Sequence, residues 1–345
     1  DGCEPTCLVG TSSGRTYGTA LRVRRMSSAD RVLARIRAVA DPRALVDLYG
    51  SSVYAPGFAA DVDVLITHDD PARLAAALGF ELIPTAPPRL HGVIEGVSVD
   101  ITVANADDVA TRSGPRDAAA LVAQLGDRDE VFQATWPHVR QFVRLRALGH
   151  NGLGYFGSFG WALLLAVPLV GELERVATGA AFPAWLRWLA RLSPGARVSF
   201  DGVSSGDPEP LFLVAPSPPT RDVARLTKRA AGHVFAEARD AVSAIGDAVT
   251  DEDAISRIVD LSERPPAGTT LVISGDDDHS RGRYDGMARR LLRDLEALGP
   301  TRSWGRFDLV GDGSWQHRIT VARAAPAIEL VEHWLAISNI DAIVE

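Results

Sequence analysis

The fold of this chain depends on the stretch Leu48-Tyr-Gly-Ser-Ser-Val-Tyr-Ala-Pro-Gly-Phe-Ala-Ala-Asp-Val-Asp-Val-Leu-Ile-Thr67. The apolar run that leads into it, residues 44–49, predicts a short strand, and a turn and a loop follow. A second apolar run, residues 62–67, predicts the next strand. Because side chains alternate between the two faces of a strand, Asp61 and Asp63 are expected to point the same way.

These paired carboxylates predict a metal site. Two carboxylates side by side repel each other, which costs stability unless a cation lies between them. Such oxygen ligands suit Mg²⁺ (or Mn²⁺), which prefers one or two carboxylates together with the phosphate oxygens of a nucleotide. The turn just upstream, Gly50-Ser51-Ser52, can bring backbone N–H groups close to a phosphate, because glycine has no Cβ in the way. We therefore expect Asp61 and Asp63 to bind metal, and Gly50 and Ser51 to bind phosphate.

A third carboxylate lies in a later predicted strand, residues 97–103, where Asp100 is the one acid. An isolated acid in an otherwise apolar strand is costly, so Asp100 should have a partner. Two metal-binding carboxylates and a third from a neighbouring strand form the layout for two-metal nucleotidyl transfer. In that chemistry one ion activates the attacking oxygen and the other stabilises the leaving pyrophosphate.

The order of these residues resembles a known superfamily. Gly50-Ser51, then Asp61-Val-Asp63, then Asp100 is similar to the nucleotidyltransferase superfamily of DNA polymerase beta and poly(A) polymerase. The middle of the chain resembles the central domain of the eukaryotic-type poly(A) polymerases. In that family a helix with basic residues leads into S-N and then G-F-L-G-G-V-S-W-A. The matching residues here are His150-Asn151 and Gly154-Tyr-Phe-Gly-Ser-Phe-Gly-Trp-Ala162.

The resemblance covers nearly the whole chain after about residue 27 and implies an α+β protein of several domains. The expected domains are an N-terminal tail or remnant (1–26), a small mixed-sheet nucleotidyltransferase core (27–115), a helical central nucleotide-binding domain (116–263) and a C-terminal ferredoxin-like module (264–345). This last module has two α-β repeats and is similar in shape to an RNA-recognition fold. It lacks the aromatic signature of RNA binders.

Periodicity gives the individual elements. The predicted helices are residues 31–39, 71–78, 117–125, 131–148, 159–167, 172–177, 182–192, 221–243, 283–298 and 326–337. The predicted strands, besides those around the acids, are residues 80–83, 269–274, 303–309 and 318–321. Residues 210–219 resemble a strand and turn of the poly(A) polymerase family. Trp185 and Trp188 lie three apart on one helix and are expected to pack in a core.

The central domain supplies candidate nucleotide contacts. Arg140 and Arg144 lie four apart on one predicted helix, so both can reach one anion. The family has lysines there that contact the triphosphate, and arginine can grip a phosphate with two hydrogen bonds. The alternative is two solvated arginines. Further candidates are Gly157, Ser158 and Phe159 at a helix start, which in the family packs against the base and sugar, and Asn151, which binds nucleotide or caps a turn.

Two positions depart from the family pattern. The family tyrosine that touches the triphosphate is Gly149 here, and the family S-L-N-G segment is reduced to Ser113-Gly114. Both changes remove nucleotide contacts. They bear on adenine selectivity and processive tailing more than on the chemistry, which depends on the three acids.

Composition sets further limits. The chain has 345 residues, of which 46% are hydrophobic, and a net charge of −8. This charge counts against tight non-specific RNA binding but leaves room for a local basic groove. Cys3 and Cys7 make a poor zinc site, because structural zinc takes four ligands. With no secretory signal and no apolar span of about 18 residues, we expect a cytoplasmic monomer without membrane contact.

The remaining polar clusters are expected to be ordinary surface. His91, His138 and His150 are scattered, and none lies at ligand spacing from a cysteine or carboxylate, so surface or capping roles are expected. Asp276-Asp-Asp278 is expected to be an exposed acidic turn rather than a cation site.

The sequence thus predicts a template-independent nucleotidyltransferase that adds a nucleoside monophosphate to an RNA 3′ hydroxyl, with AMP from ATP implied by the family. Asp61 and Asp63 would hold both ions, and Asp100 the ion that activates the hydroxyl. One alternative is the same chemistry on a small molecule, a nucleotide or a protein, which the acidic composition and short terminal module favour. Another is a non-enzymatic RNA-binding or scaffold protein, against which the presence of all three acids argues.

Overall fold

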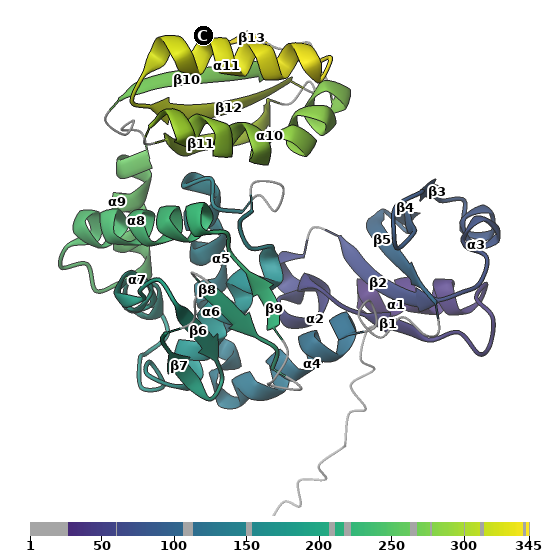
Figure 1. The fold of residues 1–345 in the computed structure, drawn as a ribbon. Helices are drawn as coiled ribbons and strands as arrows, with labels where there is room; N and C mark the ends of the chain where they lie inside the picture. Colours follow the sequence, from purple (N-terminus) through teal and green to yellow (C-terminus); the bar gives the residue numbers. More distant parts are fainter. Residues whose placement is uncertain are drawn as a thin grey trace, which may run out of the picture.

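A computed structural model describes residues 27–59, 61–105, 113–149, 154–206, 211–216, 222–262, 268–276, 278–299, 301–310, 314–340 and 343–344. They form three sheets and the helices around them, arranged as a sheet domain, a helical middle and a C-terminal module (Figure 1). The predicted tail, both cysteines and His150-Asn151 lie outside the described residues.

The first part is the predicted small mixed sheet. Its strand order is β1-β2-β5-β4-β3, and β2 and β5 are parallel while the other neighbours are antiparallel. A capping box of Ser27 and Asp30 begins α1, and Gly79 in the left-handed conformation ends α3. The elements are α1 (Ser28–Arg37), β1 (Val46–Leu48), α2 (Ser51–Tyr54), η1 (Pro56–Phe58), β2 (Val62–Thr67), α3 (Pro71–Leu78), β3 (Glu81–Ile83), β4 (Arg89–Ile94) and β5 (Val97–Ala104).

One strand of this sheet, β4, was not predicted. It pairs with β5 as a hairpin around Glu95-Gly96, and both residues have positive φ (51° and 80°). Two consecutive positive φ angles fit the tight hairpin turns that match strand twist. The hairpin places β4 directly beside the strand that carries Asp100.

The second part is mainly helical and contains a four-stranded sheet of order β7-β6-β8-β9. Trp185 and Trp188 are buried, 0% and 2% exposed, which confirms their predicted core role. The elements are α4 (Ser113–Leu125), η2 (Gly126–Arg128), α5 (Asp129–Leu145), α6 (Ser158–Val170), α7 (Ala181–Arg191), β6 (Ala196–Ser199), β7 (Gly202–Ser204), β8 (Leu211–Val214), β9 (Asp222–Arg225), α8 (Lys228–Ile245) and α9 (Asp251–Ser262).

Two helix predictions in this part were wrong. Residues 172–177 form turns, because the chain leaves the helical conformation at Gly171 (φ −106°, ψ −107°) and Leu173 N–H donates back to Pro168 at 2.7 Å. The predicted helix 221–243 begins only at Lys228. Its first residues pair with β8 as strand β9, and the Thr227 side chain caps α8 by accepting from Ala230 N–H.

The third part has the element order β-α-β-β-α-β that ferredoxin-like modules have. Its strands are all antiparallel, in the order β11-β12-β10-β13, and α10 and α11 lie together over the sheet (Figure 1). The elements are β10 (Thr269–Gly275), α10 (Asp278–Leu298), β11 (Thr301–Val310), β12 (Ser314–Val321), α11 (Ala324–Ile337) and β13 (Ile343–Val344).

The buried apolar residues form two clusters. One fills the first sheet domain, and the other runs through the helical middle and the C-terminal module. Tyr54 and Ala55, at the end of α2, belong to the second cluster although they precede β2 in the chain. Helix α2 therefore joins the sheet domain to the helical middle. Among the described residues, no helix combines the length and apolar character that a membrane crossing requires.

Candidate active site

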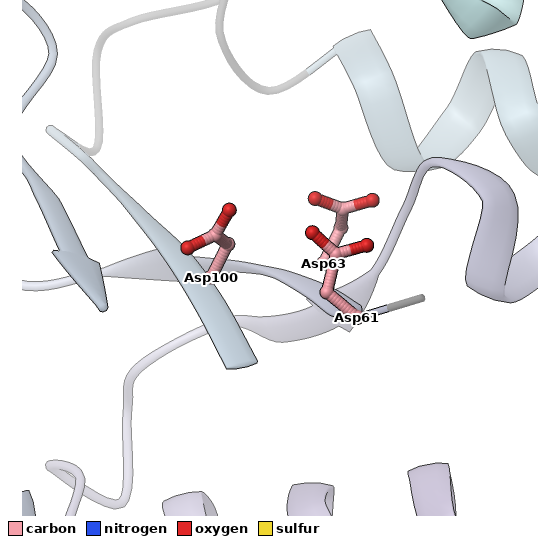
Figure 2. A group of neighbouring side chains, drawn as sticks. All are labelled: Asp61, Asp63 and Asp100. Carbon is pink, nitrogen blue, oxygen red and sulfur yellow. The ribbon is translucent and has the colours of Figure 1, made fainter. Parts of the chain in front are cut away.

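Three acids predicted to act together meet at one end of the parallel strand pair (Figure 2). Asp61 lies directly before β2, Asp63 is in β2, and Asp100 lies opposite Asp63 in the register of β2 and β5. One ligand atom from each carboxylate lies within 4.8 Å of the other two. This donor set of hard oxygens fits Mg²⁺ or Mn²⁺, and all three acids are half-buried, so a bound ion would keep access to solvent ligands.

The surroundings of Asp63 in this cluster disfavour the charged form of its carboxyl group. Burial, the carboxylate of Asp61 and the carboxylate of Asp100 raise the pKa of Asp63 to about 7, and Arg89 offsets part of the rise. A carboxylate with such a pKa is stabilised by a nearby divalent cation, because the cation favours the charged form that burial and repulsion disfavour. The cluster therefore has the electrostatics of a site that needs a cation.

The raised pKa predicts a pH dependence of metal binding. Mg²⁺ binds the carboxylate form of Asp63, and this form is lost as the pH falls through about 7. We expect Mg²⁺ affinity to fall about tenfold for each pH unit below that value. Calorimetric Mg²⁺ titrations at several pH values on either side of it would show the change, and Asp63→Asn should remove it. An affinity that stays constant across this range would contradict the assignment.

Strand β4 brings two basic side chains to Asp100. Arg89 Nη2 donates to Asp100 Oδ2 at 3.0 Å, and His91 Nδ1 lies 2.7 Å from Asp100 Oδ1. The predicted surface position of His91 is confirmed, but its contact with Asp100 was not predicted, because it depends on the unpredicted β4–β5 hairpin. His138 also differs from its prediction, since its Nδ1 lies 4.0 Å from the buried carboxylate of Asp251. The partner expected for Asp100 is thus a pair of side chains, Arg89 and His91, on the adjacent strand.

The Gly50 turn is held against the acids by backbone contacts. Gly50 has φ of +64°, and a Cβ built on it would lie 2.2 Å from Asp63 Oδ2. Tyr49 N–H donates to Asp63 O at 3.1 Å, and Asp63 N–H donates to Ser52 Oγ at 3.1 Å. Ser52 Oγ in turn donates to Tyr49 O at 3.2 Å. Ser52 was predicted only as part of the turn, yet it fastens the turn to β2.

A cavity of about 580 Å³ lies beside the two acids of β2. Ser51 lines it from the turn, and Ser158 and Phe159 line it from the first residues of α6. Gly157 is the residue that precedes α6, so the free N–H groups of this helix start lie at the same wall. The lining is completed by Tyr49, Gly50, Tyr54, Asp61, Asp63, Ser113, Gly114, Asp117 and Val223.

The predicted arginines lie in an adjoining cavity. Arg140 and Arg144 are exposed on α5 and line a second cavity of about 630 Å³. Arg140 Nη1 also donates to Phe58 O at 2.5 Å. Ser158 lines both cavities, so it connects the acidic side to the basic side. The structure therefore brings the arginines next to the acid cavity but not into it.

Two further lining residues escaped the sequence analysis. Asp117, the fifth residue of α4, is only 3% exposed and adds a buried carboxylate to the acid cavity. Tyr54 lies 5.9 Å from Phe159, ring centre to ring centre, so the two aromatic rings stand together at the wall. Nothing in the sequence indicated that Asp117 is buried, because Arg116 and Asp117 together are typical of a charged, solvent-exposed helix start.

Comparison with known proteins supports the fold. No protein-family model matches the chain, and no curated protein sequence matches it. Solved structures of the Cid1 poly(U) polymerase are similar: one has a TM-score of 0.51 at 14% identity and covers 66% of this chain and 89% of its own. Cid1 with the UTP analog UMPNPP (14% identity) and Cid1 with its short product ApU (16% identity) each have a TM-score of 0.50 over the same shares. The chain thus has the mixed α+β nucleotidyltransferase fold of these structures.

Proposed function

We propose that this protein is a template-independent nucleotidyltransferase that adds a nucleoside monophosphate from an NTP to the 3′ hydroxyl of RNA. The observation that carries the proposal is the cluster of Asp61, Asp63 and Asp100 within 4.8 Å, beside a glycine turn and a nucleotide-sized cavity. The likeness to Cid1 structures that bind a UTP analog and an RNA-type product supports it at the level of the fold.

Each acid takes a defined part in this chemistry. Asp61 and Asp63 would hold two divalent cations, and Asp100 would bind one of them. The bound ions supply activation of the attacking hydroxyl and stabilisation of the leaving pyrophosphate. Binding of Asp100 to an ion would require its release from Arg89 and His91, since both of its oxygens contact these side chains.

The phosphates would lie along the wall between the two cavities. The Gly50-Ser51 turn and the start of α6 offer backbone N–H groups, and the hydroxyl of Ser158 lies on the path toward Arg140 and Arg144. Phe159, half-buried at the cavity wall, offers an aromatic ring on which a base can stack, and the buried ring of Tyr54 packs against it. We propose AMP as the added monophosphate from the sequence resemblance. The Cid1 likeness favours UMP as its rival.

Primer extension tests the proposal directly. A labelled RNA with a free 3′ hydroxyl is incubated with Mg²⁺ and each of the four NTPs in turn. We expect extension with one preferred NTP, ATP or UTP, and none without Mg²⁺ or with the Asp61→Ala/Asp63→Ala variant. The preferred NTP decides between the two bases.

The contrary outcomes separate the parts of the proposal. No extension with any NTP, from protein that still binds Mg²⁺-NTP, would overturn RNA as the acceptor and favour the small-molecule, nucleotide or protein acceptors. Failure to bind any Mg²⁺-NTP would overturn the nucleotidyltransferase assignment itself.

A further inference from the structure

Six polar side chains, none of which lines either cavity, form a connected network. It begins at Arg146, the residue that ends α5, whose Nε donates to Glu237 Oε2 of α8 at 2.6 Å. The other oxygen, Glu237 Oε1, lies 2.9 Å from His233 Nε2, one helical turn earlier on α8. Arg146 is 3% exposed and Glu237 is 0% exposed, so this ion pair is removed from water.

The network of side chains continues from α8 through Tyr155, in the loop before α6, to the C-terminal module. His233 Nδ1 contacts the hydroxyl of Tyr155, and Arg229 Nη1 donates to the same hydroxyl at 3.3 Å. The Arg229 guanidinium lies 5.3 Å from the centre of the Tyr155 ring. Arg229 Nε then lies 3.8 Å from Glu296 Oε1, which belongs to α10 of the module. The six residues thus join α5, the loop before α6, α8 and α10.

Each hydrogen bond of this network can be assigned one donor and one acceptor without conflict. Burial raises the pKa of Tyr155 to about 12, so its hydroxyl keeps its proton and can donate to His233 Nδ1. His233 then donates from Nε2 to Glu237, whose other oxygen accepts from Arg146. Each charged member also has an opposite charge beside it, Arg146 with Glu237 and Arg229 with Glu296.

Two members of this network, Arg146 and Tyr155, lie close in sequence to the groups proposed to hold the NTP. Arg146 follows Arg140 and Arg144 on α5, and Tyr155 precedes Gly157 and Ser158 by two and three residues. Buried ion pairs add little net stability, because desolvation offsets their attraction, but separating the two partners leaves uncompensated buried charges and is strongly unfavourable. Glu237 therefore fixes the position of the arginine-bearing helix relative to the Ser158 turn.

We propose that Arg146, Glu237, His233, Tyr155, Arg229 and Glu296 are positioning residues that align the arginine helix with the Ser158 turn, and that they make NTP affinity depend on the docking of the C-terminal module through Glu296. The inference rests on the proposed function, since it assigns the NTP to these two elements. It adds that the C-terminal module acts on nucleotide binding as well as on any RNA.

The test compares three glutamate-to-glutamine variants in the full chain. Glu237→Gln removes the charge at the centre of the network, and Glu296→Gln removes the charge that the C-terminal module contributes to it. Glu332→Gln makes the same change at an exposed site on α11. We expect KM for the NTP to rise about tenfold in Glu237→Gln and about threefold in Glu296→Gln, with kcat within about twofold of wild type. Glu332→Gln should match wild type in both constants.

A double-variant cycle tests the coupling at the module. If Arg229 and Glu296 act through one contact, Arg229→Gln/Glu296→Gln should raise KM no more than Arg229→Gln alone. If the fold increase in KM of the double variant equals the product of the two single-variant increases, the two residues act independently. That result would overturn the coupling. This arm uses partly exposed residues and so remains available if Glu237→Gln fails to fold.

Direct binding separates failure of this inference from failure of the proposed function. The dissociation constant of Mg²⁺-NTP is measured by calorimetry for wild type and for each variant. Equal constants in wild type and in Glu296→Gln, or a fall in melting temperature with KM unchanged, would overturn the positioning role while leaving the proposed function intact. A wild type that binds no Mg²⁺-NTP would overturn both.

Discussion

Replacing Asp63 with asparagine is expected to abolish nucleotidyl transfer and, in the same protein, to raise the melting temperature of the metal-free state. Activity should fall by about a thousandfold or more, because the amide cannot replace a charged ligand shared by two ions and the loss is worth several kcal/mol. Primer extension under single-turnover conditions measures this fall.

The stability gain follows from the direction of the pKa shift. Folding raises the pKa of Asp63 from 3.8 to about 7. The resulting destabilisation is absent below the lower value, grows between the two values, and is complete above the higher one. An asparagine removes it, which after allowing for solvent screening is worth roughly 1 kcal/mol, or roughly 2 °C to 4 °C in melting temperature above pH 7.

The control for this variant is Asp69→Asn, which makes the same change at an exposed position of the same domain. It should leave both activity and melting temperature near wild type. A metal-free Asp63→Asn protein that melts below wild type, or one that keeps more than a tenth of wild-type activity, would contradict the assigned role of Asp63.

A single methyl group at Gly50 should be almost as damaging as loss of the metal ligand. The added Cβ would lie 2.2 Å from Asp63 Oδ2, and φ of +64° is strained for any residue with a Cβ. Either the turn or the carboxylate must move, and a displacement of about 1 Å in such a site costs about a hundredfold in rate. We expect Gly50→Ala to lose about that much activity and also to bind Mg²⁺ more weakly.

Gly79→Ala is the matched control for this change. Gly79 also has a positive φ, +71°, although its ψ is 32° where that of Gly50 is −155°, and a Cβ built there meets nothing within 4 Å. Gly79→Ala should lose about 1 kcal/mol of stability from backbone strain and Gly50→Ala at least as much, and only Gly50→Ala should lose activity in the folded protein. Chemical denaturation and primer extension on the same preparations separate the two effects. Equal activity in the two variants would show that contact with Asp63 is unimportant.

The sequence predicted those parts of the fold that depend on local pattern. Residues 71–78 show the boundary signals of a helix in full, with Pro71 at the start and Gly79 after the end, and α3 has these bounds. The run 221–243 has helical periodicity throughout, yet its first residues pair with β8 as β9. Strand pairing is a tertiary interaction, and it overrode the local preference there.

The same division holds for the site. Alternation along two apolar runs was enough to place Asp63 and Asp100 on strands, and the structure puts them side by side. The contacts of Arg89 and His91 depend on the register of a hairpin whose turn, Glu95-Gly96, lacks the commoner Asn-Gly signal. Arg140 and Arg144 line the second cavity because of the way α5 packs against its neighbours. Their four-residue spacing along the helix does not predict that packing.

The short helix α2 has a mechanical consequence. Ser52 fastens it to β2, while at its other end Gln133 Nε2 donates to Tyr54 O at 2.7 Å and the Tyr54 ring packs edge-on against Phe132 and Trp136. A relative rotation of the sheet domain and the helical middle that preserves these contacts must have its axis close to α2. Atoms close to a rotation axis move least, so the Gly50 turn and the carboxylates would keep their spacing. The parts of the two domains farthest from α2 would move apart and so admit a nucleotide.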